Sequence, residues 1–166
     1  GTNGKFRAGE KIKTTDLLYP LLLESSNDAA EIIAEHFGRD AFIKKMNQEA
    51  ETLMMSQTKY EDPSGLSPNN KSTPADLFKL VGYLYKEKKE LLQTTTKRSY
   101  SIKTHNWSSA NQFLREKGYF GGKSGYTDPA RETVVSLFSV PLGEESERPI
   151  AIVLLQSKDR YQDVET

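Results

Sequence analysis

Residues 119–126 read Tyr-Phe-Gly-Gly-Lys-Ser-Gly-Tyr and lie in a half of the chain where β-favouring residues form short runs. Segments 99–104, 133–140 and 150–156 have the same character, and turn residues separate them, so each predicts a β-strand. The last segment contains six consecutive apolar residues, Ile150 to Leu155, which is typical of a central strand covered on both faces. Because few further strands are available to flank it, we expect something outside this chain to cover it.

The first half of the chain has helical periodicity instead. Its apolar spacing predicts helices from Thr14 or Thr15 to Leu23, over about 28–37 and over about 40–54. A fourth helix begins at Thr73-Pro74-Ala75-Asp76, where Thr is a good N-cap and Pro suits the first helical position. Gly38 stands where a left-handed residue would close the second helix. The apolar stripe of the fourth helix is predicted to be buried: Leu77, Leu80, Val81, Leu84 and Tyr85.

Helices that precede strands indicate an α+β protein, in which a helical cluster packs on a mainly antiparallel sheet, rather than alternating βαβ units. We predict a single domain over residues 1–166, mainly helical over 1–98 and mainly built of strands over 99–166. With 166 residues, of which 36% are hydrophobic and 28% charged, the chain is long enough for one substantial core.

Charge and composition argue against several functions. The 23 basic and 23 acidic residues cancel, so no net field favours a nucleic acid or an anionic membrane surface. There is no cysteine, which excludes disulfides, thiolate metal sites and Cys nucleophiles. The histidines, His36 and His105, have no cluster of further ligands around them, so neither a metal nor a cofactor is expected. The first residues lack a signal-peptide pattern, so the chain is either cytosolic, already processed or cut from a longer protein.

Lys123-Ser124-Gly125 lies within the strand predicted over 119–126. In an acyl-transfer site such a Lys places a positive charge beside the nucleophile, the hydroxyl can bind a substrate carboxylate, and the Gly lets substrate backbone approach closely. The alternative is a solvated Lys followed by a Ser-Gly turn. Taken alone, the motif favours this alternative.

Ser25-Ser26-Asn27 falls at the junction between two predicted helices. A hydroxyl at this point can shuttle a proton and an amide can hold a substrate carbonyl, because a junction of this kind can project into a cleft. Helix capping explains the same residue types, since Ser and Asn are common N-cap residues. For this motif alone, capping is the better explanation.

Other candidate residues have plainer explanations. Trp107, Tyr119 and Phe120 would suit a substrate groove, but packing is the ordinary role of aromatic side chains. Glu31 and Glu35 share a helix face, where a solvated surface explains them better than acid/base catalysis.

Together and in this order, the motifs resemble the low-molecular-weight penicillin-binding proteins that act as D-alanyl-D-alanine carboxypeptidases. The matching blocks cover nearly the whole chain: Gly9-Glu10-Lys11 with Thr15 to Leu18, Leu22 to Ala30, Phe42 with Met46-Asn47, Thr58 with Pro63 to Leu66, Ser72-Thr73 with Asp76-Leu77, Asn111, and Gly122 to Thr127. Several independent blocks must coincide, so the resemblance is specific. It implies the β-lactamase-like transpeptidase fold, with the Lys-Ser-Gly motif on an edge strand and the active site between helices and sheet.

The resemblance also implies a chemistry. Such enzymes use a serine nucleophile, which forms an acyl-enzyme with peptidoglycan stem peptides that end in D-Ala-D-Ala. In the complete protein, β-lactam antibiotics acylate and trap this serine. It implies an extracytoplasmic location, in the periplasm or on the cell-wall side of the membrane. By the same resemblance Ser25, Asn27 and Lys123 are catalytic and Ser124 and Gly125 bind substrate, with Thr127 and Arg131 as weaker candidates for the terminal carboxylate.

The chain departs from this family at the nucleophile. The family uses the Ser of a Ser-x-x-Lys at the start of a helix upstream of the second motif, and nothing in Gly1 to Glu24 fits. Ser56-Gln57-Thr58-Lys59 has the spacing, but it follows Ser25 and lies just after a helix, so we interpret it as a chance match. We therefore expect an N-terminally incomplete domain that lacks its first strands and catalytic helix, is inactive alone and has that missing segment as a partner.

Two other functions stay open at this point. One is a natural non-catalytic relative that binds peptidoglycan peptides or a partner. The other is a serine β-lactamase, although the sequence around Ser25 and around Gly65-Leu66 looks more like the carboxypeptidases.

Overall fold

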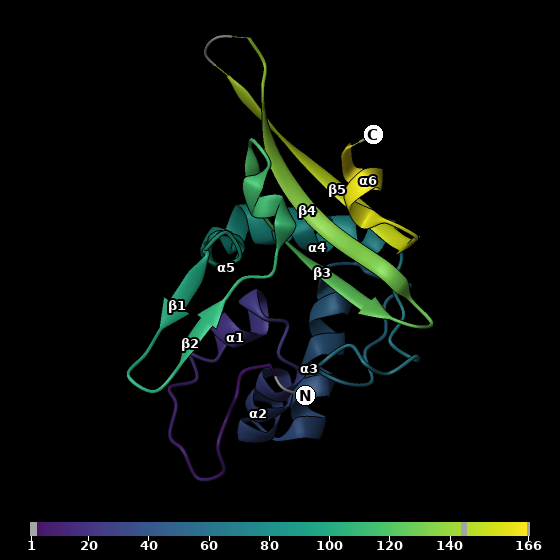
Figure 1. The fold of residues 1–166 in the computed structure, drawn as a ribbon. Coiled ribbons are helices and arrows are strands. Elements are labelled where there is room, and N and C mark those ends of the chain that lie inside the picture. Colours follow the sequence, from purple (N-terminus) through teal and green to yellow (C-terminus); the bar gives the residue numbers. More distant parts are fainter. Residues whose placement is uncertain (1–2, 144–145, 166) are drawn as a thin grey trace.

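The computed structural model describes residues 3–143 and 146–165 (Figure 1). Helices occupy the first part of the chain and strands most of the second, which confirms the predicted α+β class. No helix within these residues is long and apolar enough to cross a membrane. In chain order the elements are α1 (Leu18–Leu23), α2 (Asn27–His36), α3 (Arg39–Thr52), α4 (Pro74–Glu87), α5 (Lys89–Thr94), β1 (Ser99–Ser101), β2 (Asn106–Ser108), the 3₁₀ helix η1 (Gln112–Arg115), β3 (Tyr119–Thr127), β4 (Arg131–Pro141), β5 (Glu147–Ser157) and α6 (Arg160–Glu165).

Short polar side chains fix where two of the helices begin. The Thr73 hydroxyl accepts the N–H of Asp76 at 3.2 Å, so the predicted cap of α4 is confirmed. Ser26 caps α2 in the same way, since its Oγ accepts the N–H of Ala29 at 3.1 Å. Between α2 and α3, Gly38 has a φ of 83°, which confirms the predicted left-handed residue at this point.

The predicted start of α1 and the predicted end of α3 are wrong. α1 begins at Leu18 rather than at Thr14 or Thr15, because the four residues before it form turns. α3 ends at Thr52 rather than at Met54, whose φ of 57° lies in the left-handed region and cannot continue a helix.

The larger sheet is antiparallel, with the strand order β3-β4-β5. Lys123 lies opposite Val135 and Ser124 opposite Val134 in the pairing of β3 with β4. Among the described residues β3 has no second neighbour, so the prediction that Lys-Ser-Gly lies on an edge strand is confirmed. This edge is therefore available to other groups.

The prediction that Ile150 to Leu155 forms a central strand is wrong for the described chain. β5 pairs with β4 alone there, and β4 is the central strand. Ile150 is 41% exposed, and the five apolar residues after it are only half-buried. The continuous apolar run reflects apolar side chains on both faces of β5, but the described residues leave one edge of the strand unpaired.

The core forms where α4 and α5 meet the sheet, and α4 lies behind the strands in the view of Figure 1. It centres on Val81, Leu92 and Leu137. The predicted buried stripe of α4 is only partly correct, because Val81 is 2% exposed while its other members are half-buried: Leu77, Leu80, Leu84 and Tyr85. The first three of these border a pocket, and Leu84 and Tyr85 also pack against the core cluster.

A two-stranded hairpin, β1 with β2, ties the loop before α1 to the body of the protein. The strand predicted over 99–104 is shorter than expected, and β2 was not predicted. Trp107 is 1% exposed, and its Nε1 donates to the Gly4 carbonyl at 3.0 Å. Its ring stacks on His105 with centroids 5.2 Å apart, and His105 Nε2 lies 2.8 Å from a Glu10 carboxylate oxygen. These contacts hold the N-terminal loop against the hairpin.

Candidate active site

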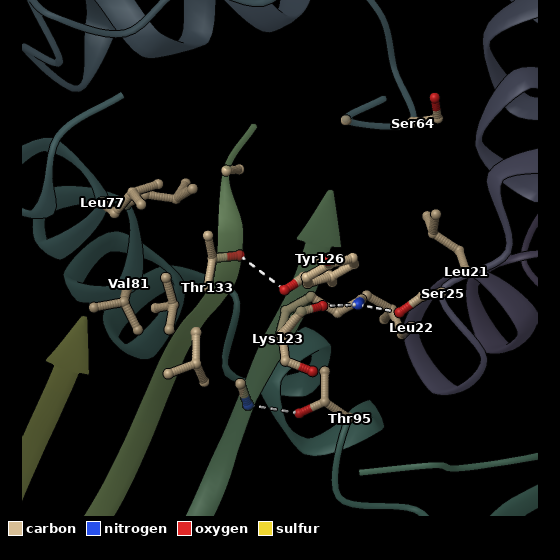
Figure 2. Close-up of a pocket in the computed structure, with 18 of the residues that line it drawn as sticks. Leu21, Leu22, Ser25, Ser64, Leu77, Val81, Thr95, Lys123, Tyr126 and Thr133 are labelled. Atoms are coloured by element: carbon tan, nitrogen blue, oxygen red, sulfur yellow. Dashed lines mark hydrogen bonds between the residues drawn. The ribbon is translucent and has the colours of Figure 1, made fainter. Parts of the chain in front are cut away.

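A pocket of about 710 Å³ lies between the helices and the sheet (Figure 2). Its walls come from α1, the α1–α2 junction, α4, α5, the three strands of the larger sheet and the loop around residue 65. Leucines form much of its apolar lining: Leu18, Leu21, Leu22, Leu77, Leu80 and Leu84. Polar residues of both predicted motifs line it as well: Ser25, Asn27, Lys123 and Ser124. The fold therefore brings the two motifs to one cavity.

Lys123 on β3 and Ser25 in the α1–α2 junction contact each other directly (Figure 2). The Lys123 Nζ donates to the Ser25 Oγ, and to the main-chain oxygen of Ser124 at 2.5 Å. Ser26, next to Ser25, is 1% exposed and caps α2, whereas Ser25 is exposed. The helix cap and the contact with Lys123 thus involve different serines of the motif.

Burial and, secondarily, the positive charge of Arg160 lower the pKa of Lys123 to about 8. Both causes disfavour the ammonium form. Arg160 is held in place because its Nη1 donates to the carbonyls of Gly125 at 2.6 Å and Thr133 at 3.2 Å. At mildly alkaline pH a large fraction of Lys123 is therefore neutral and can accept a proton from a hydroxyl.

Close packing explains the glycine that precedes Lys123. A Cβ added to Gly122 would lie 2.2 Å from the Val135 carbonyl oxygen of β4. The Gly122 N–H donates at 2.9 Å to the Oγ1 of Thr95, the residue that follows α5. These contacts fix the backbone of β3 at Gly122 and therefore the position from which the Lys123 side chain extends.

The other predicted site residues divide into two groups. Four line the pocket together with Ser25 and Lys123: Asn27, Ser124, Gly125 and Thr127. The Thr127 hydroxyl oxygen already accepts one hydrogen bond, from the N–H of Ala130 at 3.3 Å. Arg131 is exposed at the start of β4 and does not line this pocket. Arg131 thus lies at the first position of β4, outside the pocket.

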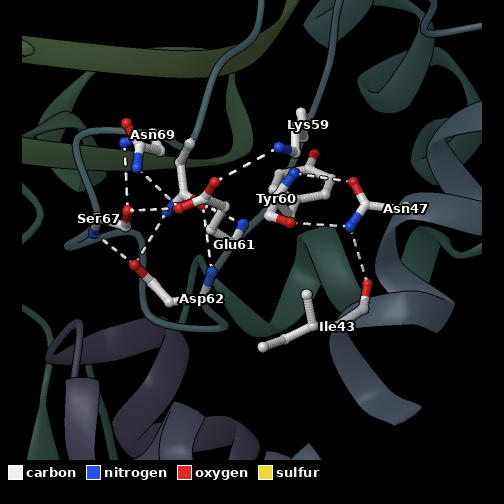
Figure 3. A network of polar contacts seen from close by, with 9 residues as sticks. Ile43, Asn47, Lys59, Tyr60, Glu61, Asp62, Ser67 and Asn69 are labelled. Atoms are coloured by element: carbon white, nitrogen blue, oxygen red, sulfur yellow. Dashed lines mark hydrogen bonds and ion pairs between the residues drawn. The ribbon is translucent and has the colours of Figure 1, made fainter. Parts of the chain in front are cut away.

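One wall of the pocket comes from a loop that was not predicted to belong to the site. Figure 3 shows the polar contacts within this loop. Asp62 organises it: the carboxylate accepts the N–H groups of Ser64 at 2.7 Å, Gly65 at 2.5 Å and Ser67. Burial acts to raise the pKa of Asp62, but these hydrogen bonds outweigh it and hold the pKa below its usual value. The loop thereby presents Ser64, Gly65 and Leu66 to the pocket.

A sequence model of the D-alanyl-D-alanine carboxypeptidase family, peptidase S11, matches residues 2–157. The chain belongs to this family. The D-alanyl-D-alanine endopeptidase of Pseudomonas aeruginosa is 28% identical over 172 residues, which cover 97% of this chain and 53% of that protein. The D-alanyl-D-alanine carboxypeptidase DacB2 of Mycobacterium tuberculosis is 34% identical over 138 residues, 78% of this chain and 47% of that protein.

Solved structures place the fold in the same group. Penicillin-binding protein D2 of Listeria monocytogenes, crystallised in its cefotaxime-bound form, matches with a TM-score of 0.81 at 30% identity. The match covers 93% of this chain and 64% of that one. The predicted penicillin-binding-protein fold is therefore confirmed for this carboxypeptidase-family chain. The chain spans about half the length of the curated relatives it matches.

In this carboxypeptidase-family chain the Ser-x-x-Lys sequence at Ser56 to Lys59 lies away from the pocket. Ser56 is exposed, and neither it nor Lys59 lines the cavity. Thr58 Oγ1 donates to Asp76 at 3.0 Å, and Lys59 donates to Glu61 at 3.4 Å. This placement agrees with the interpretation of the sequence as a chance match.

The remaining candidates serve packing in this carboxypeptidase-family chain. Trp107, Tyr119 and Phe120 do not line the pocket. Tyr119 accepts a hydrogen bond from Asn111 at 2.8 Å, and the Phe120 ring meets that of Tyr85 at 5.5 Å. In the part of the chain that the structure describes, no group of His, Asp and Glu could hold a metal ion.

Proposed function

We propose that the complete protein is a serine D-Ala-D-Ala peptidase, which cleaves peptidoglycan stem peptides through an acyl-enzyme. This chain supplies the substrate-holding and proton-handling half of the site, and the nucleophile belongs to a Ser-x-x-Lys segment outside this sequence. The contact of Lys123 with Ser25 carries the proposal, because it joins a lysine of lowered pKa to an exposed hydroxyl in a large pocket.

Each polar wall of the pocket has a task in this mechanism. Lys123 and Ser25 pass a proton between the nucleophile and the leaving amine, since both groups are in hydrogen-bond contact. The Asn27 amide holds a substrate carbonyl. The hydroxyls of Ser124 and Thr127 bind the terminal carboxylate, with Lys123 adding positive charge when protonated. The free edge of β3 offers main-chain groups to an extended peptide.

The apolar part of the pocket suits a helix rather than a peptide substrate. Leucines from α1 and α4 line it while remaining half-buried, and so does Leu155 of β5. An apolar helix that starts with Ser-x-x-Lys would bury these side chains and bring its serine toward Lys123. Because the proposed substrate lies in the cell wall, we place the complete protein outside the cytoplasm, in the periplasm or on the cell-wall side of the membrane.

Labelling with a fluorescent penicillin, with and without the segment that precedes this chain in its gene, tests the proposal. We expect labelling only with that segment, and a loss of about a hundredfold in labelling rate for Lys123→Ala, as for removal of an acid/base group. Ser56→Ala is the control and should label normally. Labelling of the chain alone that Ser56→Ala abolishes would overturn the assignment.

The same protein samples separate the other candidate functions. Binding of a stem peptide without labelling in either form would indicate a non-catalytic relative. Rapid turnover of a chromogenic cephalosporin would indicate a β-lactamase instead. Release of D-Ala from a stem peptide by the longer protein, together with stable penicillin labelling, is the outcome we expect.

A further inference from the structure

Ser25 has a backbone conformation that residues with a Cβ rarely adopt. Its φ of 53° lies in the left-handed region, between the end of α1 and the start of α2. Such a conformation persists where surrounding contacts impose it, and it is found preferentially at functional sites. The contacts that impose it therefore also determine where the Ser25 hydroxyl lies.

Glu24 makes the contacts on the N-terminal side of this residue. One carboxylate oxygen accepts the N–H of Gly4 at 3.0 Å, and the other accepts the N–H of Ser108 at 3.2 Å. The main-chain oxygen of Glu24 accepts a hydrogen bond from the Asn3 side chain at 2.7 Å. A single residue thus joins the loop before α1, the α1–α2 junction and strand β2.

The loop before α1 packs closely against the α1–α2 junction, which leaves little room for either to move relative to the other. Ser26 Oγ donates to the Asn3 carbonyl at 2.9 Å, and the Ser26 N–H donates to the Pro20 carbonyl at 3.0 Å. A Cβ added to Gly4 would lie 2.7 Å from Ser26 Oγ and 2.4 Å from the Phe6 ring. A change in the position of Glu24 is therefore transmitted to the turn that contains Ser25.

We infer that Glu24 is a positioning residue for the active site: its carboxylate fixes the turn so that the Ser25 hydroxyl meets Lys123. Glu24 does not touch the substrate and acts through Ser25. The catalytic consequence rests on the proposed function, whereas the geometric consequence concerns this chain alone.

The bonding pattern makes Glu24 hard to replace. Each carboxylate oxygen faces a main-chain N–H, so both positions require an acceptor. Gln would turn a donor toward one of these N–H groups. Asp keeps the charge but is one methylene shorter and cannot reach Gly4 and Ser108 together. We therefore expect both substitutions to disturb Ser25.

The first arm of the test measures geometry by NMR. In the native chain we expect a nuclear Overhauser effect between the Ser25 Hβ and Lys123 Hε protons. Glu24→Gln and Glu24→Asp should each weaken it severalfold. Glu31→Gln is the matched control, because Glu31 lies on α2 and pairs with Arg39 at 2.8 Å without lining the pocket. This control should leave the effect intact.

The second arm measures acylation of the longer protein by a penicillin. We expect Glu24→Gln to lower the acylation rate at saturating penicillin by about tenfold or more, with little change in the concentration needed for half-saturation, because misplacement of a catalytic group acts on the chemical step. Glu31→Gln should again have no effect.

The outcomes separate this inference from the proposed function. A Glu24→Gln chain that is less stable but keeps the full Ser25–Lys123 effect would show a purely structural role and overturn the inference. Failure of the longer protein to react with penicillin would count against the proposed function, while the NMR arm would still decide the role of Glu24. If Glu24→Gln does not fold, Glu24→Asp decides instead, and an unchanged Ser25–Lys123 effect in that chain would contradict the inference.

Discussion

Replacing Asp62 by Asn should lower the free energy of unfolding by roughly 3 kcal/mol. The side chain is buried, and Oδ1 accepts the N–H groups of Ser64 and Gly65. Oδ2 accepts the Ser67 N–H and the Asn70 side chain. Asn keeps one oxygen for the first pair and turns its NH₂ group toward the second. Because a hydrogen bond to a charged group contributes about 1.5–3 kcal/mol, the loss of two gives this value as a lower estimate.

Urea unfolding followed by circular dichroism measures this effect. We expect the midpoint to fall without a change in the dependence on urea, since the native surface is unchanged. Glu61→Gln is the control, because Glu61 is the neighbouring carboxylate and binds Lys59 and Asn69 at a more exposed position. An Asp62→Asn chain whose stability equals that of Glu61→Gln would refute the claim that the Asp62 carboxylate organises the pocket loop.

Acid unfolding gives a second check on Asp62. Its pKa is lowered in the folded chain, so its contribution is complete above the ordinary value of about 3.9. The contribution is lost as the pH falls through the lowered folded value. The Asp62→Asn chain should therefore lose less stability than the native chain over this acidic range.

Three further predictions concern the walls of the pocket. Ser26→Ala should lower the free energy of unfolding by about 1–3 kcal/mol in thermal unfolding, because it removes a buried helix cap and a bond to the N-terminal loop. Gly122→Ala should destabilise by about 2 kcal/mol or more in urea, because its Cβ would overlap the Val135 carbonyl; equal stability would mean that the strands separate easily. Lys123 should titrate near pH 8 when its Cε is followed by NMR, and Arg160→Gln should raise this pKa; a value near the ordinary 10.5 in the native chain would contradict the burial of its ammonium group.

Local sequence signals were sufficient for the elements that depend on local chemistry. The start of α4 followed from Thr73 and Pro74, since capping involves residues only three positions apart. The turn at Gly38 and the long strands β3 and β4 followed from residue type and pattern in the same way. These features require no knowledge of distant contacts.

Elements that depend on distant partners were missed. Strand β2 contains Trp107, whose hydrogen bond to Gly4 spans 103 residues, and no local pattern encodes that bond. The pocket loop is similar: Asn47 on α3 bonds both main-chain groups of Tyr60, each at 2.8 Å (Figure 3). The sequence shows only a Gly- and Pro-bearing turn region there, although the carboxylate of Asp62 beside Ser and Gly residues is a signal that could have indicated an organised loop.

The site itself could be predicted only in part. Ser25 and Lys123 were proposed from motifs 98 residues apart, and the fold brings them into contact. The motif alone could not tell which serine caps the helix, because Ser25 and Ser26 are equally suitable by residue type. The backbone decides: the left-handed φ of Ser25 turns this residue away from the cap position that Ser26 occupies. The role inferred for Glu24 was likewise inaccessible, since both of its N–H partners are distant in sequence.

The two errors in predicted burial have the same direction. The stripe of α4 and the apolar run of β5 were both predicted to be more buried than the described residues make them, and the large pocket is lined by three leucines of the stripe and by Leu155 of the run. Tyr85 of the stripe and Ile150 and Ala151 of the run line a second pocket instead. Chance errors in pattern analysis would fall on either side. A surface that the sequence treats as core but that this chain leaves half-exposed is better explained by a further apolar segment that covers it, as in the proposed complete enzyme. Under the proposed function, the leucine-lined part of the pocket would receive protein, and the part between Ser25 and the edge of β3 would receive the substrate.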